Sequence, residues 1–150
     1  MKKIVVMVLL LLVVSGISLA GTEKVINIKC YNDKWETISG AKIGLVVRGR
    51  FLGIQSTDPY GAKSFKITKS GIHQFIKDSP APRIYSRNIN IDTISSPYPI
   101  IFVDPNRVFY SEVIFKQAYL EYLQRQLETD LTQSQRTKIE EQIKRLMQLQ

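Results

Sequence analysis

The sequence predicts a mainly β fold with an α tail, in which an antiparallel β-sandwich is followed by a C-terminal helical hairpin. Short segments between residues 25 and 77 alternate apolar with polar side chains, as half-buried strands do. Turn-forming residues separate these segments. From residue 111 onward there is no Gly or Pro, and apolar side chains recur at helical spacing. We therefore expect three parts: residues 1–20, 21–110 and 111–150.

Residues 1–20 have the pattern of a secretory signal peptide. Two lysines precede an unbroken apolar run over 4–14, and Ser18 and Ala20 fit the small-residue pattern of a cleavage site before Gly21. A periplasmic or extracellular protein with a cleaved signal peptide follows from this. An uncleaved anchor is the alternative, although the apolar run is at the short limit for a membrane span.

The charge of the chain is concentrated in its front part. The formal net charge is +8, and loss of Lys2 and Lys3 leaves +6. Residues 21–110 hold 13 basic and 7 acidic side chains, whereas residues 111–150 hold six of each. In an exported protein this basicity favours anionic glycans, lipid head groups or acidic proteins as partners, and no nucleic acid is expected. Improved solubility is the alternative explanation.

Five segments have the alternation of strands: 25–31, 41–47, 51–56, 64–68 and 72–77. The side chains that we expect on the inner faces are Ile26, Ile28, Cys30, Ala41, Ile43, Leu45, Val47, Phe65 and Ile67. Leu52 and Ile54 are in phase in the third segment. Cys30 is the one cysteine, so no internal disulfide is expected, and it is read as a small buried side chain with a reactive thiol as the alternative.

Turn chemistry connects the segments. Asn32-Asp33-Lys34 starts a turn, and Arg48-Gly49-Arg50 is a tight connection in which Gly49 takes a positive φ. Asp58-Pro59-Tyr60-Gly61 forms a four-residue turn, with Pro59 at its second position and Gly61 at its last. Ser70-Gly71 turns the chain into the fifth segment.

These residues resemble the carboxypeptidase regulatory-like family, whose members are transthyretin-like (prealbumin-like) β-sandwiches. The likeness rests on Ser39-Gly40-Ala41-x-Ile43 and on Thr57-Asp58-x-x-Gly61-x-x-x-Phe65-x-Ile67, and it covers about residues 24–92. Trp35-Glu36-Thr37 and Lys63 depart from the family pattern. The resemblance implies an Ig-like or transthyretin-like sandwich that serves as an accessory module of an exported protein, and it implies no catalytic residue.

Prolines make residues 80–110 harder to interpret. Residues 84–92 have strand spacing, and Pro99 to Val103 is expected as an edge or last strand, because proline belongs at strand starts and edges. Asp104-Pro105-Asn106 is expected as a turn. A calcium site that uses Asp58, Asp104 and Asn106 is conceivable, but turn chemistry explains these residues without a metal.

Two helices are expected after residue 110. Val113, Ala118, Leu120, Leu123 and Leu127 form one apolar stripe, and a second stripe at Ile139, Ile143 and Leu146 is out of phase with it. The capping-box pattern Thr132-x-x-Gln135 separates them, so we expect helices over 111–129 and 133–149 in an antiparallel hairpin. One long helix with a phase break is the alternative.

An amphipathic helical pair must bury its apolar stripe, either on the sandwich or on another chain. Six side chains are candidates for partner interaction because they are aromatic or basic: Trp35, Arg48, Arg50, Tyr60, Tyr119 and Tyr122. Trp35 alternatively caps the open end of the sandwich. The expected partner is a cell-envelope protein or a second copy bound through the C-terminal helices, and an anionic glycan is also possible.

No catalytic, cofactor-binding or metal-binding residues are expected. A zinc cluster of ordinary composition is excluded because the chain has one Cys and one His, and no catalytic or nucleotide-binding motif is present. A Cys30–His73 nucleophilic pair would need an exposed thiol and an orienting third group. The sequence therefore favours an exported, non-enzymatic binding or assembly protein of the bacterial cell envelope. Anionic glycan or peptidoglycan binding is the second hypothesis, and a small thiol enzyme or hydrolase is the third.

Overall fold

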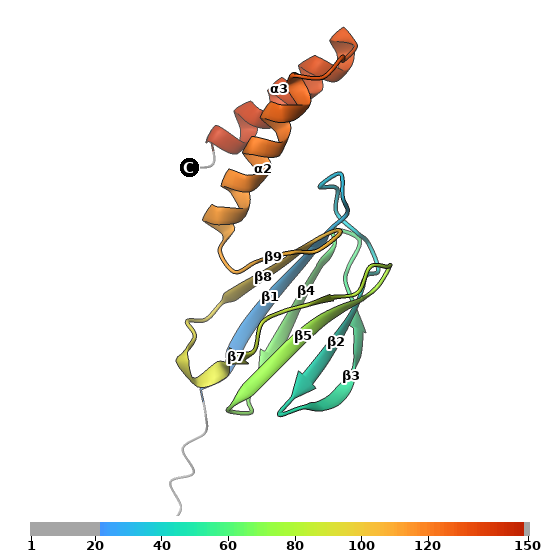
Figure 1. The fold of residues 1–150 in the computed structure, drawn as a ribbon. Coiled ribbons are helices and arrows are strands. Elements are labelled where there is room, and N and C mark those ends of the chain that lie inside the picture. The colour runs from blue at the N-terminus through green and yellow to red at the C-terminus, as the bar shows by residue number, and fades with distance from the viewer. Residues whose placement is uncertain (1–21, 149–150) are drawn as a thin grey trace, which may run out of the picture.

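The computed structural model describes residues 22–148 and shows two β-sheets packed face to face, followed by two helices (Figure 1). The predicted sandwich and helical hairpin are thus confirmed. The predicted signal peptide lies outside the described residues. Within residues 22–148, neither helix has the length and the apolar composition that a membrane crossing requires.

Sheet A has the strand order β4 (Ala62–Ile67), β1 (Lys24–Tyr31), β8 (Tyr98–Val103) and β9 (Arg107–Phe109). Its strands pair antiparallel except β1 and β8, which are parallel. The prediction that Pro99 to Val103 forms an edge or last strand was wrong, because β8 lies between β1 and β9. The expected turn at residues 104–106 leads directly into β9, whose three residues are too short to stand out as a strand in the sequence.

Sheet B has the order β3 (Arg50–Ser56), β2 (Lys42–Val47), β5 (Ile72–Ser79) and β6 (Ile84–Tyr85). β7 (Ile89–Asn90) also pairs with β5, and a short 3-10 helix, η1 (Ile91–Thr93), follows it. All pairs in sheet B are antiparallel.

The core fills the space between the two sheets. Eight of the nine side chains that were expected to face inward are buried in this core or pack against it: Ile26, Ile28, Cys30, Ala41, Ile43, Leu45, Phe65 and Ile67. The ninth, Val47, is buried outside this cluster. Phe75, Ile84, Ile89, Ile100 and Phe102 complete it. The period-two burial predicted for the front part of the chain is confirmed.

The regular alternation predicted for β3 fails at a β-bulge. Gly44 pairs with Ile54, but Val46 pairs with Phe51, so Leu52 is the extra residue. Because Gly44 and Val46 lie on one face of β2, their partners Ile54 and Phe51 share that face. Phe51, rather than Leu52, therefore lies beside Ile54 on the outer face of sheet B.

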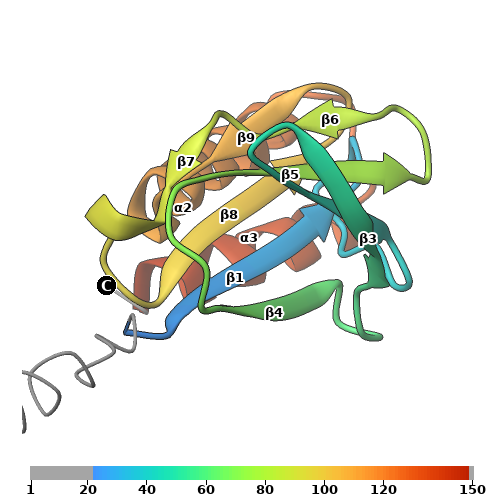
Figure 2. The same cartoon turned by 90° about the horizontal axis from the view of Figure 1, so that it is seen from below.

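The C-terminal helices form the predicted hairpin, α2 (Glu112–Leu127) and α3 (Gln133–Gln148), and the single long helix is excluded. The predicted capping box is present: Gln135 N–H donates to the Thr132 hydroxyl, and Thr132 N–H donates to Gln135 Oε1. Figures 1 and 2 show both helices on the outer side of sheet A, away from sheet B. The helices therefore cover one face of the sandwich only.

Candidate interaction surfaces

An aromatic cluster attaches α2 to the sandwich. It consists of Tyr31, Trp35, Phe109, Phe115, Tyr119 and Tyr122. Trp35 stacks on Tyr119 and Tyr122 with ring centroids 5.3 and 5.5 Å apart, and the Arg107 guanidinium lies 5.5 Å from its ring. Trp35 is only 3% exposed although it lies in the loop after β1. Three of the six candidate residues, Trp35, Tyr119 and Tyr122, are thus brought together and contact one another.

The apolar stripe of α2 differs from the one expected. Phe115, Ala118, Tyr119 and Tyr122 face the sandwich, whereas Val113 is 65% exposed. Leu123 is buried, as the stripe predicted. Phe115 was not recognised from the sequence as a member of this stripe. It lies three, four and seven residues before Ala118, Tyr119 and Tyr122, and this helical spacing could have identified it. Of the two surfaces weighed for this stripe, the sandwich is the one that α2 contacts.

The outer face of sheet B has no such cover in residues 22–148. We call the outward apolar side chains Val46, Phe51, Ile54, Ile72, Ile76 and Tyr85 the sheet B face, and the polar side chain of Gln74 lies among them. Phe51 is 58% exposed, and Ile54, Ile72 and Tyr85 are also largely exposed. Figure 2 shows β3 and β5 in front of β1 and β8, with both helices behind them. An exposed apolar patch of this kind is typical of an interaction site.

The sheet B face is hollowed at Gly44. A cavity of about 200 Å³ is lined by Gly44, Phe51, Ile54 and Ile76, with Asp78 and Arg83 at its polar side. A Cβ atom on Gly44 would lie 2.9 Å from Cε2 of the Phe51 ring. The absence of a side chain at Gly44 therefore leaves room for Phe51 and for this hollow. Asp78 and Arg83 form an ion pair beside it.

Arg48 and Arg50 lie together at the end of the sandwich where β2 turns into β3. They line a hollow of about 810 Å³ with Val47, Leu52, Thr68, Lys69 and Ser70, which we call the basic hollow. Arg48 and Gly49 have φ of 49° and 77°, as the predicted tight turn requires. Tyr60 is 80% exposed at the other end of β3. The structure therefore separates Tyr60 from the two arginines.

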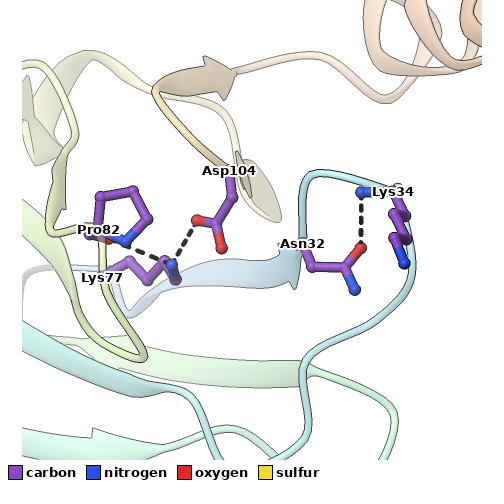
Figure 3. Close-up of polar contacts among 5 residues, drawn as sticks. All are labelled: Asn32, Lys34, Lys77, Pro82 and Asp104. Atoms are coloured by element: carbon purple, nitrogen blue, oxygen red, sulfur yellow. Dashed lines mark hydrogen bonds and ion pairs between the residues drawn. The ribbon is translucent and has the colours of Figure 1, made fainter.

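A buried ion pair joins the two sheets. Lys77 of β5 is fully buried, and its Nζ donates to an Asp104 carboxylate oxygen and, at 3.2 Å, to the Pro82 carbonyl (Figure 3). Cys30 is also fully buried. Burial raises the pKa of the Cys30 thiol from 9.0 to about 12, while the charge of Lys77 lowers it and that of Asp104 raises it. This confirms the buried interpretation of Cys30, because a thiol of this kind is a poor nucleophile.

His73 does not orient Cys30. Its side chain is buried, and its Nδ1 lies 3.1 Å from the Gly71 carbonyl oxygen. The charged side chains that act on the Cys30 thiol are Lys77 and Asp104. The Cys30–His73 nucleophilic pair therefore has no support in these contacts.

Two of the three residues of the conceivable calcium site, Asp58 and Asp104, serve other contacts. Asp58 Oδ1 accepts hydrogen bonds from the N–H groups of Tyr60 and Ala62, as the predicted turn requires. The predicted turn after β1 has a similar bond, in which Asn32 Oδ1 accepts from Lys34 N–H (Figure 3). Asp104 binds Lys77. Within the described part of the chain, no three His, Cys, Asp or Glu side chains are grouped as metal ligands.

Comparison with known proteins gives a likeness in structure but none in sequence. No protein family matches the sequence, and no curated protein matches it. The structure is similar to that of 5-hydroxyisourate hydrolase from Klebsiella pneumoniae, with a TM-score of 0.45 and 13% sequence identity. The likeness covers 59% of this chain and 94% of the hydrolase.

Proposed function

We propose that this chain is an exported, non-enzymatic assembly protein of the bacterial cell envelope that dimerises through its sheet B face. The uncovered apolar surface at Phe51, Ile54 and Tyr85 is the observation that supports this proposal most directly. The signal-peptide pattern of residues 1–20 supports export. The residue patterns around Gly40 and Gly61 support a carboxypeptidase regulatory-like module, which carries no catalytic residue of its own.

A second copy is the occupant that we propose, because two identical faces with exposed apolar side chains can bury each other around a two-fold axis. The Phe51 ring lies over Gly44 and is still 58% exposed, so it and the half-exposed Tyr85 are available for such a contact. Two sheets that pack face to face are already the way in which this chain builds its own core.

Such a dimer would leave the helices free. Because α2 and α3 lie on the side of sheet A, the two hairpins would project from opposite ends of the dimer (Figure 1). Each hairpin would then be available to a further envelope protein. This agrees with the expectation from the sequence that the helices bind a partner. The aromatic cluster would hold each hairpin in place.

The test is the mass of the purified protein in solution, measured by light scattering and by sedimentation at about 5–100 μM. We expect the wild-type protein to be a dimer and the Phe51→Glu/Ile54→Glu variant to be a monomer, since buried carboxylates oppose association. Val113→Glu/Ile114→Glu is the matched control, because Val113 and Ile114 are similarly exposed, at 65% and 57%, but lie on α2. A wild-type protein that is monomeric throughout, or a control that dissociates equally, would overturn the proposal.

A further inference from the structure

We propose that the basic hollow is a separate binding site for an anionic polysaccharide that bears carboxylate groups. The hollow lies at the end of the sandwich, with Arg50 and Leu52 of β3 on one side and Thr68 to Ser70 after β4 on the other. This site does not depend on dimerisation through the sheet B face.

Backbone geometry fixes the position of Arg48. Its N–H donates to the Ile72 carbonyl at 3.0 Å, which ties the β2–β3 turn to the start of β5. Its side chain lies against Gly71, since a Cβ atom there would be 3.2 Å from the Arg48 Nε atom. Gly71 has a φ of 96°. The turn between β4 and β5 thus provides both the space for the guanidinium and the neighbouring Lys69.

The cations of the hollow are not neutralised within residues 22–148. None of Arg48, Arg50 and Lys69 forms an ion pair with a described acidic side chain. Asp92 lines a smaller adjoining hollow, where its carboxylate accepts a hydrogen bond from Gly71 N–H. Three like charges that form no ion pair repel one another, and a bound anion would relieve that repulsion.

The other lining groups suit a sugar polymer. Guanidinium groups bind carboxylates with two parallel hydrogen bonds. The Thr68 and Ser70 hydroxyls can both donate to and accept from sugar hydroxyls. Val47 and Leu52 offer apolar surface to the C–H faces of a sugar ring. A volume of about 810 Å³ has room for more than one sugar unit.

Polygalacturonate is the probe, and its affinity is measured by biolayer interferometry at about 50 and 300 mM salt. We expect Arg48→Gln/Arg50→Gln to weaken binding by about tenfold or more at low salt. Lys42→Gln/Lys66→Gln removes the same charge outside the hollow and should weaken binding only slightly. In the wild-type protein, Lys42 donates to Ser56 and Lys66 pairs with Glu23.

Two further arms separate the ligand classes. Neutral dextran should not bind, and poly-glutamate should bind at least about tenfold more weakly than polygalacturonate, because it lacks the sugar hydroxyls. If the two double variants lost the same affinity for polygalacturonate, overall charge would explain the binding, and the basic hollow would not be its site. Equal binding of poly-glutamate would assign the hollow to acidic proteins and would overturn the polysaccharide. A wild-type protein that fails to bind polygalacturonate at low salt would also refute the proposal.

Discussion

Gly61 lies where the β3–β4 turn meets the chain at the end of β1. Its φ is 71°, and a Cβ atom on it would lie 2.9 Å from the Cys30 carbonyl oxygen and 3.1 Å from the Ile38 nitrogen. The neighbouring Thr57 hydroxyl accepts from Ala41 N–H and donates to the Ile38 carbonyl. The Thr-Asp-x-x-Gly pattern thus fixes a corner of the sandwich through contacts with the backbone.

We expect Gly61→Ala to lower the free energy of unfolding by about 2–4 kcal/mol, because positive φ and backbone overlap act together. Gly40→Ala is the control: Gly40 has a φ of 69°, but an added Cβ would have no neighbour within 4 Å. Gly40→Ala should lower the free energy of unfolding by about 1 kcal/mol. Urea unfolding followed by circular dichroism measures both, and equal effects would show that the close approach at Gly61 is unimportant.

At the scale of the element, the sequence predicted the features that depend only on residues close together in the chain. The alternation at Ile26 and Ile28 and the capping box at Thr132 and Gln135 needed no knowledge of distant partners. The bulge at Leu52 shifts the phase of β3 by one residue, and a single sequence with apolar residues on both sides of the shift does not reveal it. Position within a sheet also depends on distant pairing, so the parallel pairing of β8 with β1 was not foreseen.

The candidate site was predictable to a similar degree. The turn at residues 48–50 was recognised, and with it two of the cations in the basic hollow, but Lys69 comes from another turn and was missed. The sheet B face was missed because its outward residues look like ordinary strand residues. Only the placement of the helices on the opposite side shows that this face is uncovered.

Helix α2 offers a test of how the hairpin is attached. Phe115 is 5% exposed and contacts Tyr31 and Trp35, with ring centroids 4.9 and 5.5 Å away. We expect Phe115→Ala to cost about 3–5 kcal/mol, and to shift the emission of Trp35 to longer wavelength as water reaches it. Val113→Ala changes an exposed side chain of the same helix and should alter stability by less than about 0.5 kcal/mol. Trp35 is the only tryptophan, so its emission reports directly on this contact. Unchanged emission in Phe115→Ala would contradict the attachment of α2 through this cluster.

At the scale of the whole molecule, the ion pair between Lys77 and Asp104 joins the two sheets through the core. Lys77 belongs to β5 of sheet B, and Asp104 follows β8 of sheet A. Lys77 is fully buried, so removal of its charge leaves the Asp104 carboxylate without its partner in a largely dry interior. We expect Lys77→Met to lower the free energy of unfolding by about 3–5 kcal/mol.

Two further variants separate the lost partner from lost packing. Lys77→Met/Asp104→Leu removes both charges and should recover more than half of the loss, because no uncompensated charge remains. Arg83→Gln breaks the more exposed pair with Asp78 and should cost less than about 1 kcal/mol. Urea unfolding of the three variants gives these values. If Lys77→Met cost no more than Arg83→Gln, or if the double variant were no more stable than Lys77→Met, the buried pair would not be what holds the two sheets in register.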